Sequence, residues 1–244
     1  MKIRLDRLLV EKGFTPSRQK AQALIGAGLV WVNDQKIDKA GTQVEADAVI
    51  EVAGPDHPYV SRGGVKLAAA LDFFQLDPAG LVCADIGAST GGFTDCLLQR
   101  GAKKIFAIDV GYGQLAWKLR QDERVVVMER TNARHLKAGD LDEPIDLAVI
   151  DASFISLKLL LPPILPLFKT SPAIVALIKP QFEVGRDRIG KGGVVRETEL
   201  HEAVVADIRD FATSLRLACC GVTPSPILGP KGNREFLIYL SGNN

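Results

Sequence analysis

Apolar positions along most of this chain alternate between strand-like and helix-like spacing. From residue 59 onward, apolar runs predict strands at 81–86, 104–110, 125–128, 145–150, 173–178, 216–222 and 235–240. Helical spacing separates most of these runs, at about 92–100, 112–120, 156–168 and 197–214. This alternation is typical of an α/β domain with a mainly parallel, Rossmann-like sheet covered by helices on both faces. Only a Pro/Gly loop at 224–232 joins the last two strands, so the final strand is predicted to be antiparallel.

The first 55 or so residues follow a different pattern, which predicts a small α+β domain. Ser17 precedes a helical run at 21–25, and short strands follow at 30–32 and 49–52, with a turn at 33–34 after the first strand. An earlier helical run is marked by Leu5, Leu8, Leu9 and Phe14.

A break in this patterning separates the two parts of the chain. Residues 53–58 read Ala-Gly-Pro-Asp-His-Pro, and two prolines and a glycine suit neither helix nor strand. We therefore expect a small domain at 1–54, a linker at 55–60 and a large domain at 61–244.

Composition narrows the class of protein. With 244 residues, 47% hydrophobic and 24% charged, the chain resembles an ordinary globular protein, which argues against disorder and disulfide scaffolds. The four cysteines form no CxxC pair and only three histidines are present, so we expect reduced thiols and no metal site. The charged N-terminus lacks an apolar run, and the most apolar stretch, 159–168, contains three prolines. A span needs about 20 apolar residues, so we expect no membrane association and a cytoplasmic location.

A glycine-rich loop follows the first predicted strand of the large domain. That strand ends in Asp85-Ile86 and runs into Gly87-Ala88-Ser89-Thr90-Gly91-Gly92-Phe93, which opens a helix. The next strand ends at Asp109, where a carboxylate can hold ribose hydroxyls. Ser89 stands where dinucleotide enzymes carry their second glycine, and Asp85 suits a ligand with an amino group and a sulfonium charge. The loop favours S-adenosylmethionine over NAD, and a turn without a ligand stays open.

Polar residues also end the fourth and fifth strands of this domain. Asp151 follows the run 145–150, and Lys179 follows the run 173–178. Both lie where the carboxyl edge of an open α/β sheet binds ligands. Lys66 and Glu235 flank the domain, and either could equally be an ordinary surface residue.

These residues carry a resemblance to a known family. Lys66, Asp151, Lys179 and Glu235, together with the glycine loop, resemble the Lys-Asp-Lys-Glu tetrad of FtsJ-type RNA ribose 2′-O-methyltransferases. The N-terminal part is similar to the small RNA-binding domain of ribosomal protein S4. The motifs at 61–64 and 151–156 resemble the TlyA family, whose members are called hemolysins but methylate cytidine riboses in ribosomal RNA. The absence of an Asn/Asp-Pro-Pro-aromatic turn at 151–154 argues against an exocyclic amine as acceptor.

The resemblance implies a role for each group of residues. Lys179 would act as the base that takes the proton of the ribose hydroxyl, and the tetrad carboxylates would orient the lysines and the hydroxyl. Asp109 would hold the ribose of the cofactor; Asn132 would lie near its adenine, with a helix N-cap as an equally open alternative. The full set implied for S-adenosylmethionine is Asp85, Gly87, Ser89, Gly91, Gly92, Phe93, Asp109 and Asn132.

Basic residues indicate where ribosomal RNA or a ribosomal subunit would bind. Residues 2–20 carry six basic side chains against two acidic ones, although the whole chain has a net charge of only +1. A second basic segment, 185–196, follows Lys179. The candidate phosphate contacts are Arg4, Arg7, Arg18, Lys20, Arg62, Arg186, Arg188, Lys191 and Arg196. A non-catalytic RNA-binding or assembly factor stays an alternative, and a pore-forming protein a remote one.

Overall fold

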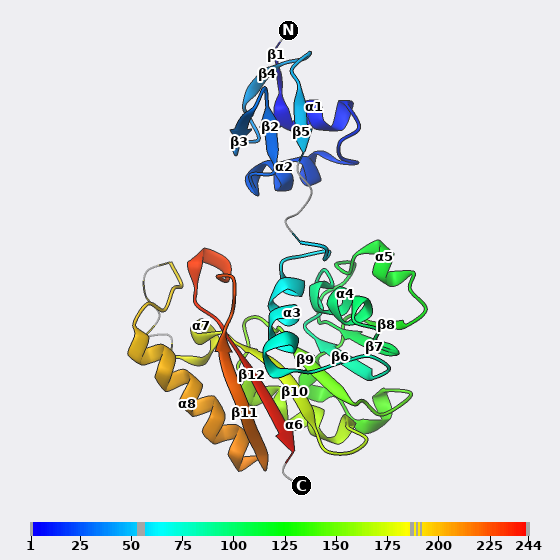
Figure 1. Cartoon of the computed structure of the whole chain (residues 1–244), viewed down its shortest axis with the longest axis vertical. Helices are drawn as coiled ribbons and strands as arrows, with labels where there is room; N and C mark the ends of the chain where they lie inside the picture. Colours follow the sequence, from blue (N-terminus) through cyan, green and yellow to red (C-terminus); the bar gives the residue numbers. More distant parts are fainter. Residues whose placement is uncertain (1, 53–56, 186–187, 189, 191, 243–244) are drawn as a thin grey trace. The chain divides into compact units, whose positions relative to one another are not determined.

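The computed structural model describes residues 2–52, 57–185, 188, 190 and 192–242. The chain divides into two compact units between Pro58 and Tyr59 (Figure 1). Each unit has its own apolar core.

The N-terminal unit packs two helices against short antiparallel strands. Leu5, Leu8 and Leu9 from the first helix and Ile25 from the second are buried in its core. The elements are β1 (Lys2–Arg4), α1 (Leu5–Glu11), α2 (Arg18–Gly26), β2 (Val30–Val32), β3 (Gln35–Ile37), β4 (Gln43–Glu45) and β5 (Ile50–Val52). Strand β1 pairs with β4, and β2 lies between β3 and β5.

Local signals explain where these elements begin and end. The Ser17 hydroxyl accepts a hydrogen bond from the Lys20 N–H and caps α2, as its position predicts. Asn33 and Asp34 adopt positive φ angles of 49° and 63°, which suits the tight turn between β2 and β3. Phe14, expected on the first helix, lies beyond its end and is 43% exposed. The prediction was wrong there because Gly13, with φ of 77°, ends the helical turn.

The large unit is built on a seven-stranded sheet. Its strands are β6 (Val82–Ile86), β7 (Lys104–Ile108), β8 (Val125–Met128), β9 (Leu147–Ile150), β10 (Ala173–Ile178), β11 (Leu217–Pro224) and β12 (Phe236–Gly242). They lie in the order β11-β12-β10-β9-β6-β7-β8. Strand β12 runs antiparallel to β10 and β11, and the other neighbouring pairs of the described sheet are parallel, which confirms the predicted mainly parallel, Rossmann-like sheet with an antiparallel last strand.

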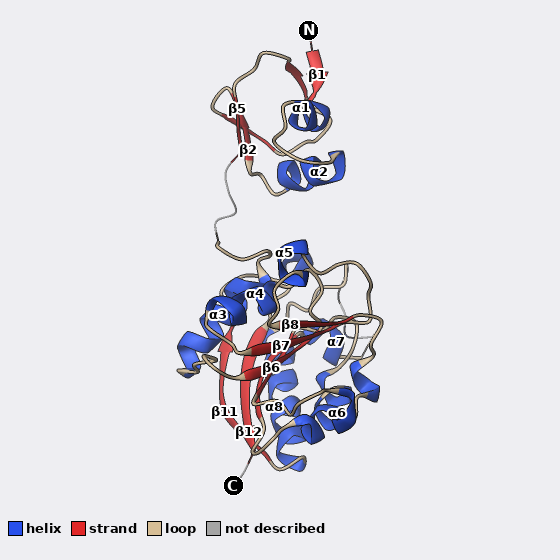
Figure 2. Ribbon diagram, turned by 90° about the vertical axis from the view of Figure 1, so that its right-hand side faces the viewer, coloured by secondary structure: helices blue, strands red, loops and turns tan. Residues whose placement is uncertain are grey.

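Helices cover both faces of this sheet (Figure 2). Alternate side chains of one strand serve opposite layers: Cys83 packs with the α3 and α4 side, and Ala84 with the α6 and α8 side. One layer holds α3 (Gly63–Phe74), α4 (Gly92–Gln99) and α5 (Trp117–Arg120), and the other α6 (Leu161–Ile164) and α8 (Thr198–Ser214). The short α7 (Pro180–Glu183) follows β10. No helix in the described ranges is long and apolar enough to cross a membrane.

Two predicted helices needed correction, and one helix was missed. Only 117–120 of the stretch 112–120 is helical, since Gly113 adopts φ of 72°. The stretch 156–168 divides into α6 and two 3₁₀ turns, because its prolines cannot donate to a continuous helix. Helix α3 was not predicted, because its first turn begins with two glycines instead of a recognisable cap. The 3₁₀ turns lie at Ala133–His135, Ala138–Asp140, Leu157–Leu159, Leu165–Leu167 and Pro230–Gly232.

Candidate active site

Two of the predicted catalytic residues meet at the carboxyl ends of adjacent strands. Asp151 directly follows β9 and Lys179 directly follows β10, and these strands pair in parallel. The Lys179 Nζ atom lies 2.6 Å from Asp151 Oδ1 and donates a hydrogen bond of 2.9 Å to Ser153 Oγ. Lys179 is only 6% exposed, so these contacts fix its amine at the sheet edge.

The other two form a buried ion pair between distant parts of the chain. Lys66 lies in the first turns of α3, and Glu235 immediately precedes β12. The Lys66 Nζ atom donates to Glu235 Oε2 at 2.6 Å, and both residues are buried. Gly229 lies so close that a Cβ there would be 2.0 Å from Glu235 Oε1. Any other residue at 229 would therefore displace the carboxylate.

All four residues line one cavity of about 290 Å³. A larger cleft of about 1020 Å³ lies beside it and is lined in part by Asp109, Asn132 and Phe154. The two spaces share four lining residues: Gly87, Ser89, Asp151 and Ser153. The fold thus brings the tetrad together at the place where the glycine loop meets the ends of β9 and β10.

The glycine loop is held close to neighbouring backbone. Gly87 adopts φ of 86°, and a Cβ there would lie 3.0 Å from Ala152 Cα. Asp109, at the end of β7, accepts hydrogen bonds from the N–H groups of Ser89 at 2.8 Å and Gly111 at 2.6 Å. These bonds place the Asp109 carboxylate against the loop and on the wall of the larger cleft.

Two residues implied for the cofactor lie outside both spaces. Asp85 is fully buried and accepts hydrogen bonds from the N–H and hydroxyl of Thr94, which ties β6 to the first turn of α4. Burial raises the pKa of the Asp85 carboxyl to about 7. Gly91, with φ of 95°, faces Leu119, whose Cδ1 would lie 2.2 Å from an added Cβ. The structure therefore gives both residues a supporting role: Asp85 ties β6 to α4, and Gly91 packs the loop against Leu119.

The remaining cofactor candidates reach one space or the other. Gly92 and Phe93 line the smaller cavity. Asn132 lines the larger cleft, and its Oδ1 also accepts a hydrogen bond from the Arg134 N–H at the start of a 3₁₀ turn. The N-cap that the sequence left open is thus present, on a residue that also borders the cleft.

The loop after Asp151 carries a residue that sequence reasoning missed. Phe154 is 89% exposed, adopts a φ of 64° and lines the larger cleft. Its ring lies 5.1 Å from the ring of Phe182 in α7. A bulky residue in left-handed conformation costs about 1–3 kcal/mol, and such strain concentrates at functional sites. The only sequence signal was its place in the motif at 151–156.

In the N-terminal unit, two of the predicted phosphate contacts surround a buried carboxylate. Asp6 is fully buried and accepts hydrogen bonds from the side chains of Arg4, Arg18 and Gln22. The hydrogen bond from Arg4 is the main reason that the pKa of Asp6 lies far below its usual range. The two arginine side chains are still 40% and 52% exposed, so their guanidinium groups are fixed at the surface.

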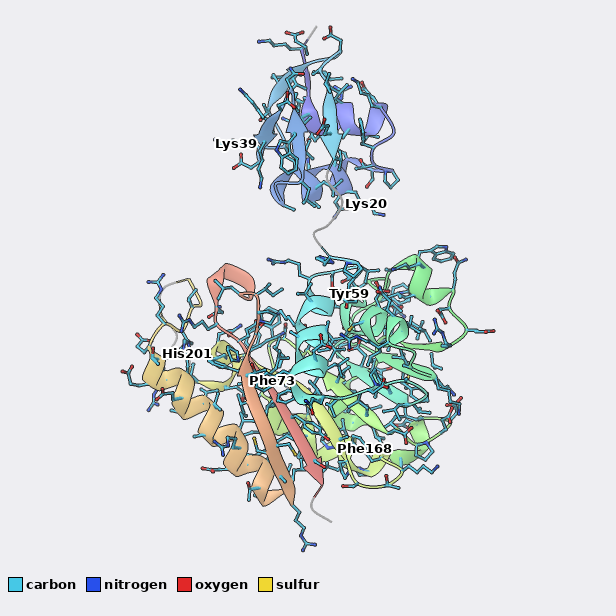
Figure 3. The ribbon with its side chains drawn as sticks, viewed as in Figure 1. Lys20, Lys39, Tyr59, Phe73, Phe168 and His201 are labelled. Atoms are coloured by element: carbon cyan, nitrogen blue, oxygen red, sulfur yellow. The ribbon has the colours of Figure 1, made fainter. Side chains whose placement is uncertain are left out.

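The other basic candidates are mostly exposed. Arg7 forms a long ion pair of 3.9 Å with Glu11, and Lys20, on α2, is exposed (Figure 3). In the large unit, Arg62 borders the smaller cavity and Arg188 and Arg196 are exposed. Arg186 and Lys191 lie outside the described residues.

A buried amide connects the end of the basic segment to the tetrad. Asn233 lies two residues before Glu235. Its side chain donates to Gly193 O and accepts from the Val195 N–H. His201 lies at the start of α8 (Figure 3). Its Nε2 atom is 3.0 Å from Val195 O. The segment 193–195 is therefore fixed to the hairpin that carries Glu235.

Comparison with known proteins identifies both units. Residues 59–241 match the FtsJ-like methyltransferase family, and residues 3–50 match the S4 domain. The chain is 49% identical to "Putative rRNA methyltransferase YqxC" of Bacillus subtilis, over 98% of this chain and 85% of that protein. It is 46% identical to the 16S/23S rRNA (cytidine-2′-O)-methyltransferase TlyA of Mycobacterium tuberculosis, over 97% of this chain and 89% of that protein.

Solved structures agree. A structure described as "Putative hemolysin from Streptococcus thermophilus" is 43% identical and superposes with a TM-score of 0.80, covering 100% of this chain and 89% of that one. At 13% identity, the magnesium protoporphyrin IX methyltransferase from Synechocystis has a TM-score of 0.51 over 74% of this chain and 80% of that one, which shows a shared fold. With a family match that covers the whole sheet and the complete tetrad, this chain belongs to the FtsJ-like family of S-adenosylmethionine-dependent methyltransferases.

Proposed function

We propose that the protein transfers a methyl group from S-adenosylmethionine to the ribose 2′-hydroxyl of a cytidine in ribosomal RNA. Residues 1–54 would bind RNA and residues 61–244 would carry out the reaction. The observation that carries this proposal is the meeting of Lys66, Asp151, Lys179 and Glu235 around one cavity beside the glycine loop. The Mycobacterium tuberculosis relative, named as a cytidine-2′-O-methyltransferase, supports the cytidine ribose as acceptor.

The larger cleft fits the proposed cofactor. Gly87 lines the cleft with no side chain to fill it, and the Asp109 carboxylate borders the cleft, where it can accept from ribose hydroxyls. Ile108, Ala133 and Leu160 provide apolar wall for an adenine ring. When bound, S-adenosylmethionine supplies a methyl group already activated on a sulfonium. The chain therefore needs only to orient the acceptor oxygen and remove its proton.

Lys179 is the proposed base. Lys179 lines the smaller cavity, beside Asp151 and Ser153, which line both spaces. Its Nζ atom would take the proton of the 2′-hydroxyl as the methyl group passes from the sulfonium to the oxygen. Asp151 and Ser153 hold that amine in place through contacts of 2.6 and 2.9 Å. Lys66 and Glu235 line the same cavity and would position the ribose hydroxyls.

RNA binding is proposed to use several surfaces. Arg4 and Arg18 around Asp6, with Arg7 and Lys20, would contact phosphates in the N-terminal unit. Arg62 lies at the rim of the smaller cavity and would contact the phosphate beside the target. The exposed ring of Phe154 offers a face on which an unstacked base can lie.

The test is transfer of labelled methyl to ribosomal subunits that lack the modification, followed by nuclease mapping. We expect label on a ribose 2′-oxygen and a loss of about 10²–10⁴-fold in the Lys179→Ala variant. Lys158→Ala is the matched control, because Lys158 forms an exposed ion pair of 2.6 Å with Asp207 away from the cavity. Full activity of Lys179→Ala would remove that lysine from the mechanism.

Two alternative functions can be tested with the same purified protein. Binding of S-adenosylmethionine and RNA without transfer to either subunit would indicate a non-catalytic RNA-binding factor. Because one relative is named Hemolysin A, leakage of dye from liposomes is also measured, and release at nanomolar protein would contradict the enzyme proposal.

A further inference from the structure

One polar side chain beside the tetrad is buried without a partner. Gln181 lies in α7, two residues after Lys179, is 8% exposed and lines the larger cleft. Within the described part of the chain, no donor reaches its buried Oε1 atom. A buried carbonyl oxygen without a hydrogen bond is costly and rare, so one at the wall of a binding cleft indicates a ligand that donates to it.

Neighbouring contacts hold Gln181 at this wall. Glu183, in the same short helix, accepts hydrogen bonds from Ser156 Oγ at 2.5 Å and from the Leu157 N–H at 2.9 Å. The rings of Phe182 and Phe154 add a contact between the same two segments. Helix α7 is therefore fastened to the loop that follows Asp151, which holds Gln181 beside the proposed acceptor site.

The sheet order separates Gln181 from the proposed adenosine end of the cleft. Asp109 follows β7 and Asn132 follows β8, whereas Gln181 follows β10, with β9 and β6 between β10 and β7. At about 4.8 Å per strand, roughly 14 Å separate the ends of β10 and β7. By contrast, the Cα atoms of Gln181 and Lys179 are at most about 7.6 Å apart, because only two peptide units join them. The amide thus belongs with the acceptor nucleotide.

We propose that Gln181 recognises the base of the nucleotide that is methylated, by accepting a hydrogen bond at Oε1 from the exocyclic amine of cytosine. This inference rests on the proposed function. Uracil presents an acceptor oxygen where cytosine presents that amine, so with the amide oriented as in this structure a uridine would leave two oxygens facing each other. Gln181 would therefore select cytidine over uridine, while the tetrad acts on the ribose that both nucleotides share.

The experiment compares ribosomal subunits that carry plasmid-encoded rRNA with cytidine or uridine at the mapped target position. We expect the wild-type protein to prefer cytidine by about tenfold or more in kcat/KM, an effect of the size that one base contact supplies. Gln181→Met, which keeps the volume but not the acceptor, should bring the preference close to one. Gln181→Glu keeps an acceptor and should retain the preference even if its overall activity falls. Binding of S-adenosylmethionine, measured by calorimetry, should be unchanged in both variants.

Gln114→Met is the matched control. Gln114 lines the same cleft at its Asp109 end and accepts from Ser89 Oγ, so its loss should leave the preference intact. An unchanged preference in Gln181→Met, or weaker cofactor binding with an unchanged preference, would overturn the assignment. Equal methylation by the wild-type protein of the subunits with cytidine and those with uridine at the target position would also overturn it. Failure of the proposed function would appear differently, as no 2′-O-methyl transfer by the wild-type protein to natural unmodified subunits.

Discussion

The buried ion pair between Lys66 and Glu235 allows a quantitative test of the active-site structure. Their side chains are 10% and 0% exposed and their charged atoms are 2.6 Å apart. Removing one partner of such a pair leaves an uncompensated buried charge, which typically costs about 3–5 kcal/mol. Domains of this kind are stable by only about 5–15 kcal/mol, so either single variant should lose a large share of its stability.

The assay is a double-mutant cycle in which the stability of each protein is measured by urea unfolding. We expect Lys66→Met and Glu235→Leu each to lower the unfolding midpoint by roughly 2 M, given a slope of about 2 kcal/mol per M. The double variant should regain most of the loss, because two apolar side chains of suitable size replace a pair that was costly to desolvate. Its methyl transfer should nevertheless stay abolished, since stability alone does not position a ribose hydroxyl.

The Lys158–Asp207 pair is the control for this cycle. Its charged atoms also lie 2.6 Å apart, but the side chains are 34% and 54% exposed. Exposed pairs contribute about 0–1 kcal/mol, so Lys158→Met should change the midpoint little. If the single variants at Lys66 and Glu235 also cost less than about 1 kcal/mol and add without coupling, the pair is not buried as described and the reasoning fails.

Three further predictions concern other parts of the chain. Because burial raises the pKa of Asp85 to about 7, its carboxyl costs stability progressively as pH rises from about 4 to about 7. In thermal unfolding, the stability gain of Asp85→Asn over the wild type should therefore be larger at pH 8 than at pH 4. A gain of the same size at both pH values would contradict this. Asp6→Asn should weaken RNA binding and flatten its salt dependence, because Arg4 and Arg18 lose the carboxylate that fixes them. Filter binding at several salt concentrations measures both effects. Phe154→Gly should raise the thermal midpoint by relieving the left-handed strain and yet lower methyl transfer, whereas Phe154→Ala should lower transfer without that gain in stability; equal transfer by all three proteins would exclude the ring from substrate binding.

Much of the large unit follows from local patterning. Residues of a parallel strand that is buried on both faces form a short apolar run, so β6, β7, β9 and β10 could be located to within a few residues. Because the carboxyl ends of such strands share one edge, Asp109, Asp151 and Lys179 could be assigned to that edge as well. The Ser17 cap and the turn at 33–34 were equally local signals.

The sequence could not show what each polar residue contacts. Lys66 and Glu235 are 169 positions apart, and each read alone as an ordinary charged residue. Asp6 counted as one acid among basic residues until folding buried it beneath two arginines. Asp85 looked like a ligand contact, yet packing places it under α4 with Thr94.

The features that could be predicted differ from those that could not for a simple physical reason. Periodicity and turn chemistry depend on neighbours along the chain, so the sequence by itself determined the strands of the large unit, the glycine loop and the polar residues at the strand ends. It did not indicate the three-residue strands β1, β3 and β4, which are too short to show a pattern. Partners that are far apart along the chain are chosen by the sheet order and by the depth of burial. Only the tertiary structure decided that Lys66 would pair with Glu235, that Phe154 would remain exposed in a strained conformation, and that the Gln181 oxygen would be buried at the cleft without a donor.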